Sequence, residues 1–502
     1  MKCMRVLVSS LVFATFSPVS ILASPLTDRG LRLSLNAAGL DILAKEIKEN
    51  ALEPVKDARL PDVNEKVDYG IRVEAKDLKY SVDFTHLRVF PQQGSLGLEL
   101  GVKNIKIDIP RLRASKKVIV NLATTCKNTQ IKIAQSKTLN LSASLPLWVE
   151  QDDIKTKIDQ IHFEIPDDQY RVIGPASCSG KLGIGDLIRS IARDVLKRSK
   201  QTIIDAVKRN VNKAEKGLED ELNKVAHQTL DLRGSVLPGL PKIDLSLKVS
   251  PFQVVIDGQR LGIEFAIDAG KRLKQFQTAG GMQTWPSWSE QHLGALGVNP
   301  DLLNEAIADW LERHPDGFNL SATDLPALKS FLKKELAVNA WPNLAYMDTS
   351  SNDLSLKLTF RKPPRIIFDE ASNNLHIIAN LLLTFGVELN GEWVDYYHLN
   401  LDLAAFAFLS LNGDLLEIGF VDVPNADWDG YFAEGFNNGL EIARREVLNV
   451  MVHGVMQGLY EEGAFLSLWL PTLYLGGKYV RGASLYYDSP YISAGLQASD
   501  EP

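Results

Sequence analysis

The feature that most constrains the fold of this chain is a long helix-forming stretch over residues 181–226. Between Asp186 and Lys216 it contains no glycine or proline, and apolar residues recur there at steps of three and four. The apolar stripe consists of Leu187, Ile191, Val195, Ile203, Val207, Val211, Ala214, Leu218 and Leu222. An unbroken helix of that length would reach roughly 65 Å, and few small domains can cover such a stripe. Because the flanking segments alternate like strands, we expect a long curved sheet wrapped along this helix rather than a coiled coil.

The first residues indicate export. Residues 1–5 are basic, residues 6–16 are apolar, and small residues surround Ala23. This pattern predicts a secretory signal peptide over residues 1–23, which is too short for a transmembrane helix. A buried N-terminal strand is the alternative interpretation. With a signal peptide, the mature protein is expected in the periplasm or outside the cell.

Two cysteines remain after the predicted signal. Cys3 lies within it, which leaves Cys126 and Cys178. Two cysteines in an exported chain predict one disulfide, and two buried free thiols are the alternative.

The charge changes sign between the two halves of the 502-residue chain. Residues 25–240 hold 35 Lys and Arg against 29 Asp and Glu, whereas residues 241–502 hold 18 against 33. Such a difference favours two domains with different surroundings. The basic half could contact anionic lipid, although a solvated surface of mixed charge fits equally well. Nucleic acid is not an expected partner of an acidic, exported chain.

The strand-like segments show slips in their alternation. Leu96, Leu98, Leu100 and Val102 alternate in one phase, and the run from Ile105 to Ile109 continues in the other. Slips of this kind are typical of β-bulges, which bend sheets. We therefore expect strongly curved antiparallel sheets.

Two further helices are predicted, and with them the same order of secondary-structure elements occurs twice in the chain. Asn36 is expected to cap a short helix whose apolar face is Leu40, Leu43, Ala44 and Ile47. A second long helix is predicted over residues 431–460, with an apolar face of Phe436, Leu440, Ala443, Val447 and Met451. Helix, curved strands and long helix thus follow one another twice around a strand-rich middle near residues 230–270. The fold class is α+β.

Several stretches resemble the bactericidal/permeability-increasing and lipopolysaccharide-binding proteins. The segments that carry the resemblance are residues 35–44, 96–109, the basic stretch 110–117, 354–360, the Pro363-Pro364 pair and 375–389. The chain is thereby similar to the tubular lipid-binding superfamily, which also contains the cholesteryl ester and phospholipid transfer proteins. The similarity is one of pattern and element order over nearly the whole mature chain.

The resemblance implies an elongated boomerang of two barrels, each a curved antiparallel sheet wrapped on a long helix, joined by a central sheet. It implies an N-terminal barrel over residues 24–240, a central sheet and connector over 241–275, and a C-terminal barrel over 276–502, whose last strands are expected to return to the central sheet. It also implies apolar tunnels for the acyl chains of phospholipid or lipopolysaccharide-like lipids. In that family a disulfide ties a strand to the long helix. Here Cys178 precedes the helix, so the disulfide is expected at a different place.

The candidate site residues follow from these helices and strands. The expected lipid-lining residues are Leu40, Leu43, Ile47, Leu187, Ile191, Val195, Phe436, Leu440, Val447 and Met451. The expected contacts for an anionic head group or membrane surface are Arg111, Arg113, Lys116 and Lys117, in a turn after Pro110. A dry packed core is the alternative for the lining residues.

The motifs of common enzyme classes do not occur in this sequence. There is no His-Glu-x-x-His, Gly-x-Ser-x-Gly, Gly-x-Gly-x-x-Gly or phosphate-loop pattern, and the eight histidines show no ligand spacing. We therefore expect a protein that is not an enzyme and has no metal or cofactor, but carries bound phospholipid or fatty acyl lipid. The alternative is a structural or interaction protein of the cell envelope with filled barrels.

Overall fold

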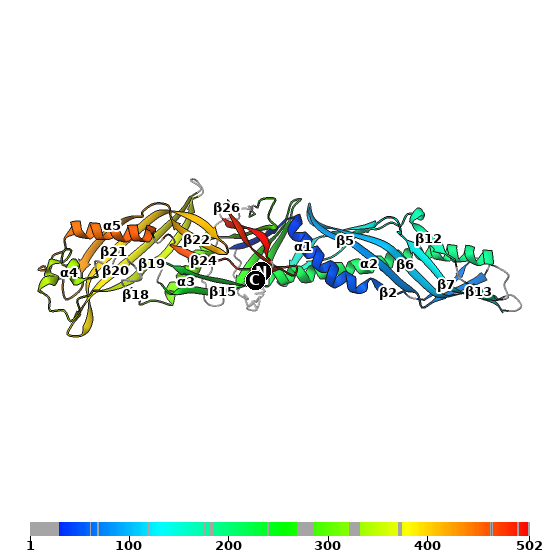
Figure 1. Cartoon of the computed structure of the whole chain (residues 1–502), viewed down its shortest axis with the longest axis horizontal. Helices are drawn as coiled ribbons and strands as arrows, with labels where there is room; N and C mark the ends of the chain where they lie inside the picture. The colour runs from blue at the N-terminus through cyan, green and yellow to red at the C-terminus, as the bar shows by residue number, and fades with distance from the viewer. Residues whose placement is uncertain are drawn as a thin grey trace, which may run out of the picture.

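A computed structural model of the chain shows an elongated molecule with a curled sheet at each end and further strands between them (Figure 1). It describes residues 30–60, 62–67, 70–117, 121–174, 177–180, 185–237, 240–268, 285–286, 288–320, 332–369, 374–461, 463, 465–488 and 491–499. The predicted signal peptide, residues 1–23, lies outside the described residues.

The first curled sheet is antiparallel and has ten strands in the described part of the chain. They are β2 (Asp57–Arg59), β3 (Val63–Val67), β4 (Ile71–Lys76), β5 (Lys79–Gln92), β6 (Ser95–Lys117), β7 (Asn121–Ile133), β8 (Leu139–Leu145), β11 (Asp159–His162), β12 (Tyr170–Ile173) and β13 (Ser177–Gly180). The register of β5 on β6 shifts between Ser81 and Asp83 and again between Phe84 and His86, and Asn104 on β6 has a φ of 51°. These bulges coincide with the slips in alternation and bend the sheet, so the predicted curvature is confirmed.

Two cysteines fasten one end of this sheet. Cys126 on β7 lies directly opposite Cys178 on β13, and the two form a disulfide that closes a separation of 52 residues. The predicted disulfide is confirmed, and it joins two strands rather than a strand and the long helix.

Two helices pack on the first sheet. α1 (Ala37–Ile47) begins after Asn36, whose side chain accepts a hydrogen bond from the Gly39 N–H, and it continues into the short turns η1 (Lys48–Leu52) and η2 (Glu53–Val55). α2 (Gly185–Ala226) has 42 residues and runs lengthwise along the sheet (Figure 1). The second half of its predicted stripe is buried: Val207, Val211, Ala214, Leu218 and Leu222. The long helix is therefore confirmed, and its apolar face supplies the core.

The second curled sheet lies at the other end of the molecule. Its strands are β18 (Phe318–Leu320), β19 (Ser355–Asp369), β20 (Asn374–Leu389), β21 (Glu392–Asn412), β22 (Leu415–Phe420) and β23 (Asn425–Phe432). The helices here are α3 (Pro300–Glu312), α4 (Lys334–Ala337), η7 (Pro342–Tyr346) and α5 (Arg445–Glu461).

The predicted helix over residues 431–460 is wrong in its first half. Tyr431 and Phe432 end β23, and α5 begins only at Arg445. Gly435 and Gly439 between them have φ values of 90° and 77°, which a right-handed helix does not allow.

Strands from both halves of the chain form the middle of the molecule. They are β1 (Leu31–Leu35), β14 (Thr229–Val236), β15 (Lys242–Ile256), β16 (Leu261–Asp268), β17 (Gly294–Val298), β24 (Leu466–Trp469), β25 (Leu473–Leu475), β26 (Lys478–Asp488) and β27 (Tyr491–Ser499). The hydrogen-bonded order is β22-β24-β14-β15-β16-β1-β17-β27-β26-β25, so these strands continue the second curled sheet. We call them the central strands.

A short segment, residues 285–286, covers part of the central strands. Glycines make room for it: a Cβ at Gly262 or Gly297 would lie 2.7 Å from the Trp285 ring or 2.6 Å from Pro286. Beneath it, buried Arg32 pairs with buried Glu264 at 3.3 Å. Removing one member of this pair would deprive a buried charge of its ion-pair partner, which is costly.

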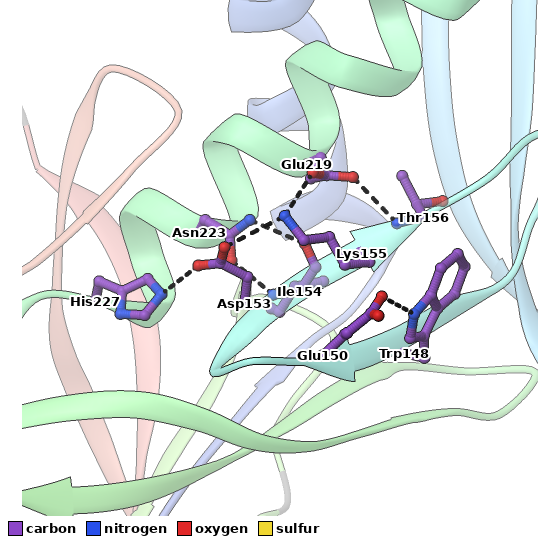
Figure 2. Close-up of polar contacts among 9 residues, drawn as sticks. All are labelled: Trp148, Glu150, Asp153, Ile154, Lys155, Thr156, Glu219, Asn223 and His227. Atoms are coloured by element: carbon purple, nitrogen blue, oxygen red, sulfur yellow. Dashed lines mark hydrogen bonds and ion pairs between the residues drawn. The ribbon is translucent and has the colours of Figure 1, made fainter.

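A two-stranded hairpin, β9 (Leu147–Glu150) and β10 (Asp153–Thr156), is fastened to the end of α2 (Figure 2). The Asn223 amide donates to the Ile154 carbonyl at 2.9 Å and accepts from the Ile154 N–H at 2.7 Å. Lys155 contacts Glu219 at 3.1 Å, and Asp153 contacts His227 at 3.1 Å.

The charges of this hairpin depend on pH. Hydrogen bonds from Lys155 and then from His227 lower the pKa of Asp153. Because the folded-state pKa is lowered, the stability that Asp153 contributes is present at neutral pH and is lost as the pH falls through that value.

Among the described helices, none combines the length and the apolar content needed to cross a membrane.

Candidate functional site

An apolar cavity of about 30 Å³ lies among the central strands, where the sheet curls round far enough to bring β22 and β24 opposite β26 and β27. Every residue that lines it is apolar. The lining is Leu31, Leu230, Leu232, Leu247, Leu296, Val298, Leu302, Leu303, Leu416, Leu468, Leu470, Pro471, Leu485, Ile492 and Ala494. A cavity without polar groups gives water no hydrogen-bond partners and suits an apolar ligand.

Cross-strand pairs build the walls of this cavity. On one side Leu230 lies opposite Leu247, and Leu416 lies opposite Leu468. On the other side Val298 on β17 lies between Leu31 on β1 and Ile492 on β27. Because side chains alternate along a strand, each of these strands presents one apolar face to the cavity.

Helix α3 contributes Leu302 and Leu303 to the cavity. Asn299 caps the helix by accepting a hydrogen bond from the Asp301 N–H at 2.9 Å. Asn304 then fastens the helix to β19, because its amide donates to the Ile366 carbonyl at 2.9 Å and accepts from the Ile366 N–H at 2.7 Å. The position of the two leucines is thereby set by hydrogen bonds as well as by packing.

The cavity reaches the surface along one side. Leu470, Pro471 and Leu485 are half-buried, whereas Leu302 and Leu468 are buried. The half-buried residues mark the mouth. An ion pair lies beside it, between Arg481 on β26 and Asp414 in the turn from β21 to β22, at 3.2 Å.

The predicted lining residues on α1 lie elsewhere. Leu40, Leu43 and Ile47 are buried, and they belong to the core that α1 forms with α2 and β5. Leu187, Ile191 and Val195 lie on the part of α2 whose side chains are outside the described residues. None of the three α1 residues is among those that line the central cavity.

The predicted lining residues near α5 are divided between core and surface. Met451 is buried on α5, and Val447 and Phe436 are half-buried against the core. Leu440 is 75% exposed, because it lies in the segment before α5 and not on a helix. The expected position of Leu440 on a helical face is therefore wrong, and its contact with an acyl chain stays a prediction. Phe436 instead packs edge-on against Tyr396, with ring centroids 5.0 Å apart.

Burial raises the pKa values of two neighbouring tyrosines in the core beside Phe436. It raises the pKa of Tyr396 strongly, with the Glu441 charge adding to the effect. Burial and the Asp429 charge raise the pKa of Tyr397 to about 12. Both phenols are therefore neutral at physiological pH, and the Tyr396 hydroxyl donates a hydrogen bond to the Glu441 carboxylate at 3.0 Å.

The four predicted head-group residues do not lie in a turn. Arg111, Arg113, Lys116 and Lys117 belong to β6, which continues unbroken through Pro110 to Lys117. Arg111 lies between Lys76 on β4 and Lys127 on β7 in the register of the sheet. Like charges directly opposite one another destabilise a sheet, so this outer face is basic at some cost in stability.

The residues of the central cavity were not predicted as a site from the sequence, although their strands show an alternating apolar pattern. Leu230 and Leu232 alternate, as do Leu466 and Leu468. Alternation shows that each strand has an apolar face. It does not show that strands more than 200 residues apart face one another across a cavity.

Comparisons with known proteins concern the fold. No protein-family model and no curated protein sequence matches this chain. Among solved structures, lipopolysaccharide binding protein is similar, at 15% identity and a TM-score of 0.43, over 94% of this chain and 99% of that one. P47 of Clostridium botulinum E1 is similar at 11% identity and a TM-score of 0.33, over 94% and 99%. Takeout 1 of Epiphyas postvittana is similar at 11% identity and a TM-score of 0.22, over 37% and 90%. These likenesses concern the fold alone. The chain has two strongly curled antiparallel sheets with packed helices, as the resemblance noted in the sequence implies.

Proposed function

We propose that this protein binds lipid and holds an acyl chain in the cavity among the central strands. The observation that carries the proposal is the lining of that cavity, which is apolar at every position. Burying one methylene contributes about 0.8 kcal/mol, so a sixteen-carbon chain could gain about 12 kcal/mol before the costs of binding. Apolar contact is the dominant attraction that such a lining can offer.

The size of the cavity sets a condition on this proposal. A volume of about 30 Å³ has room for a small part of an acyl chain. A longer chain therefore requires leucine side chains to separate from one another. Each displaced leucine exchanges one apolar contact for another, so the exchange leaves little apolar surface exposed to water.

The wider context that we propose is an exported carrier. A signal peptide over residues 1–23 would place the chain in the periplasm or outside the cell, where a disulfide such as Cys126–Cys178 persists. Phospholipid or a lipopolysaccharide-like lipid is the expected source of the acyl chain. The basic outer face around Arg111 is the candidate contact for an anionic membrane surface.

A structural protein of the cell envelope is the second candidate. Leu40, Leu43, Ile47 and Met451, which were expected to line tunnels, are fully buried in the core. That observation favours filled barrels, and it predicts a stable protein partner in place of a lipid.

Native mass spectrometry of the purified mature protein distinguishes the two functions. A lipid carrier should retain a bound lipid or take up cis-parinaric acid, an eighteen-carbon fluorescent fatty acid. If the protein carries no lipid after gentle purification and binds neither this fatty acid nor a fluorescent phospholipid, the lipid proposal is wrong.

A pair of variants tests whether the cavity is the place of binding. Ala494→Val adds two methyl groups inside the cavity, and Ala379→Val adds the same groups in the core of the second sheet. Ala494→Val should weaken binding of the fatty acid about tenfold, which corresponds to roughly two excluded methylenes. Ala379→Val should lose stability only, because overpacking strains a core without touching the ligand. Equal affinity in both variants, measured by fluorescence titration, would place the site elsewhere.

A further inference from the structure

Strand β26 has one edge that is paired over only part of its length. It pairs with β27 from Tyr479 to Asp488, but with β25 only from Lys478 to Val480. From Gly482 to Asp488, the described strands provide no ladder partner on that second edge. The register on β27 also shifts between Gly482 and Ser484, and a bulge of this kind bends a strand and interrupts pairing.

Side chains close the gap between this edge and the end of the β21–β22 hairpin. Arg481 forms its ion pair with Asp414 there, at 3.2 Å. At Gly482 a Cβ would lie 2.9 Å from Cδ1 of Leu470 and 3.7 Å from Cδ2 of Leu411, so these two leucines lie against the glycine backbone. We call this boundary the seam. It is formed by Arg481 and Gly482 on one side and by Leu411, Asp414 and Leu470 on the other.

The seam lies at the mouth of the central cavity. Leu470 belongs both to the seam and to the cavity lining, and Leu485 lies three residues after Gly482 on β26. The other strands around the cavity follow the order β22, β24, β14, β15, β16, β1, β17, β27 and β26, and each is joined to the next by ladder hydrogen bonds over at least part of its length. Opening the cavity between paired strands would break a ladder, whereas opening it at the seam separates side chains, among them the Arg481–Asp414 ion pair, and breaks no ladder of the described strands.

We propose that the seam is the gate through which a single acyl chain reaches the cavity, and that Arg481 binds the anionic head group of that lipid in place of Asp414. The proposal rests on the lipid-binding function proposed above. A guanidinium can bind a carboxylate or a phosphate through two parallel hydrogen bonds. Here Nη1 of Arg481 contacts Oδ2 of Asp414 at 3.2 Å. Arg481 and Asp414 are partly exposed, at 30% and 21%, so a head group held there remains in contact with water. The expected ligand class is therefore a single-chain anionic amphiphile, such as a fatty acid or a lysophospholipid.

The proposal gives the residues of the ion pair two roles: the pair closes the gate, and Arg481 binds the head group. Two ligands and two variants distinguish these roles. cis-Parinaric acid carries the acyl chain and the charge, and its methyl ester carries the chain alone. Asp414→Asn should accelerate uptake of both ligands and bind the acid more tightly, because it weakens the gate and removes the competing carboxylate. Arg481→Gln should also accelerate uptake of the ester, but should bind the acid about tenfold more weakly, because a charge-assisted hydrogen bond is lost.

Two further variants keep the test interpretable. Asp353→Asn removes a comparable ion pair, with Lys333 at 2.6 Å, that takes no part in the seam or the cavity, so its rates and affinities should equal those of the unchanged protein. Arg481→Lys retains the charge and should recover part of the affinity for the acid. Thermal unfolding of each variant shows that it is folded before its binding is compared.

The measurements are stopped-flow rates and equilibrium titrations on the full mature chain. Unchanged uptake rates in Asp414→Asn and Arg481→Gln would overturn the seam as the gate. An unchanged preference for acid over ester in Arg481→Gln would overturn the role of Arg481. If the unchanged protein bound neither ligand, the proposed function itself would fail, and the inference with it.

Discussion

Two asparagines fasten strands to helices by the same arrangement. The Asn223 amide holds both backbone groups of Ile154, and the Asn304 amide holds both backbone groups of Ile366. In each case a side chain provides the donor and the acceptor that a neighbouring strand would otherwise provide. The first attaches the β9–β10 hairpin to α2 (Figure 2), and the second attaches α3 to β19 beside the cavity.

Asn223→Ala should therefore lower the free energy of unfolding by about 1–3 kcal/mol, because it leaves a part-buried N–H and carbonyl without their partners. Asn140→Ala is the matched control: Asn140 donates one hydrogen bond to Glu99 on the exposed face of the sheet, and its loss should cost less than about 0.5 kcal/mol. Urea denaturation measures both. An equally small loss of unfolding free energy in both variants would show that the Asn223 hydrogen bonds do not stabilise the attachment of the hairpin.

At the scale of elements, the long helix α2 packs closely against α1 at a glycine. Gly217 of α2 lies against α1, and a Cβ there would lie 3.0 Å from Cγ2 of Ile47 and 3.4 Å from the Ala51 Cβ. Gly454 of α5 has no atom within 4 Å of the corresponding position. The two glycines are both within helices, but only the first is required by packing.

Gly454→Ala should stabilise the protein by about 0.5–1 kcal/mol, because alanine loses less conformational entropy in a helix than glycine does. Gly217→Ala should gain less than this, and Gly217→Leu should destabilise the protein by about 1–3 kcal/mol through overpacking against α1. Guanidinium denaturation of the three variants provides the comparison. A Gly217→Leu variant as stable as Gly454→Ala would contradict the close packing of α1 on α2.

At the scale of the whole molecule, the two ends share the central strands. β1 comes from the start of the chain, and its partners are β16 and β17 from the second half. β14 pairs with β15 and with β24, which lies more than 200 residues further along the chain. Neither end can therefore complete its hydrogen bonds without strands from the other half of the chain.

A fragment of residues 25–240 should consequently fail to unfold cooperatively on its own, because β1 and β14 would lose their ladder partners. Mixing it with a fragment of residues 241–502 should restore a single complex. Size-exclusion chromatography and near-ultraviolet circular dichroism follow both steps. A monomeric, cooperatively folded 25–240 fragment would show that the predicted boundary at residue 240 separates independent domains.

The sequence alone determined the features that depend on neighbours along the chain. The stripe from Val207 to Leu222 shows the helical period, and Asn36 caps α1 where a capping residue was expected. The slip between Val102 and Ile105 marked a bend in β6. Periodicity, caps and bulges are local consequences of backbone geometry, so they can be read without knowledge of the fold.

The tertiary structure decided where those elements meet. Only the curling of the sheet brings Leu416 and Leu468 opposite Leu485 and Ile492, and so creates the cavity. Likewise, only the chain path before α5 places Leu440 at the surface. An apolar face has the same pattern whether it meets a helix, another strand or a ligand, because the hydrophobic effect has no direction. The choice among these partners depends on long-range pairing, which no local pattern encodes.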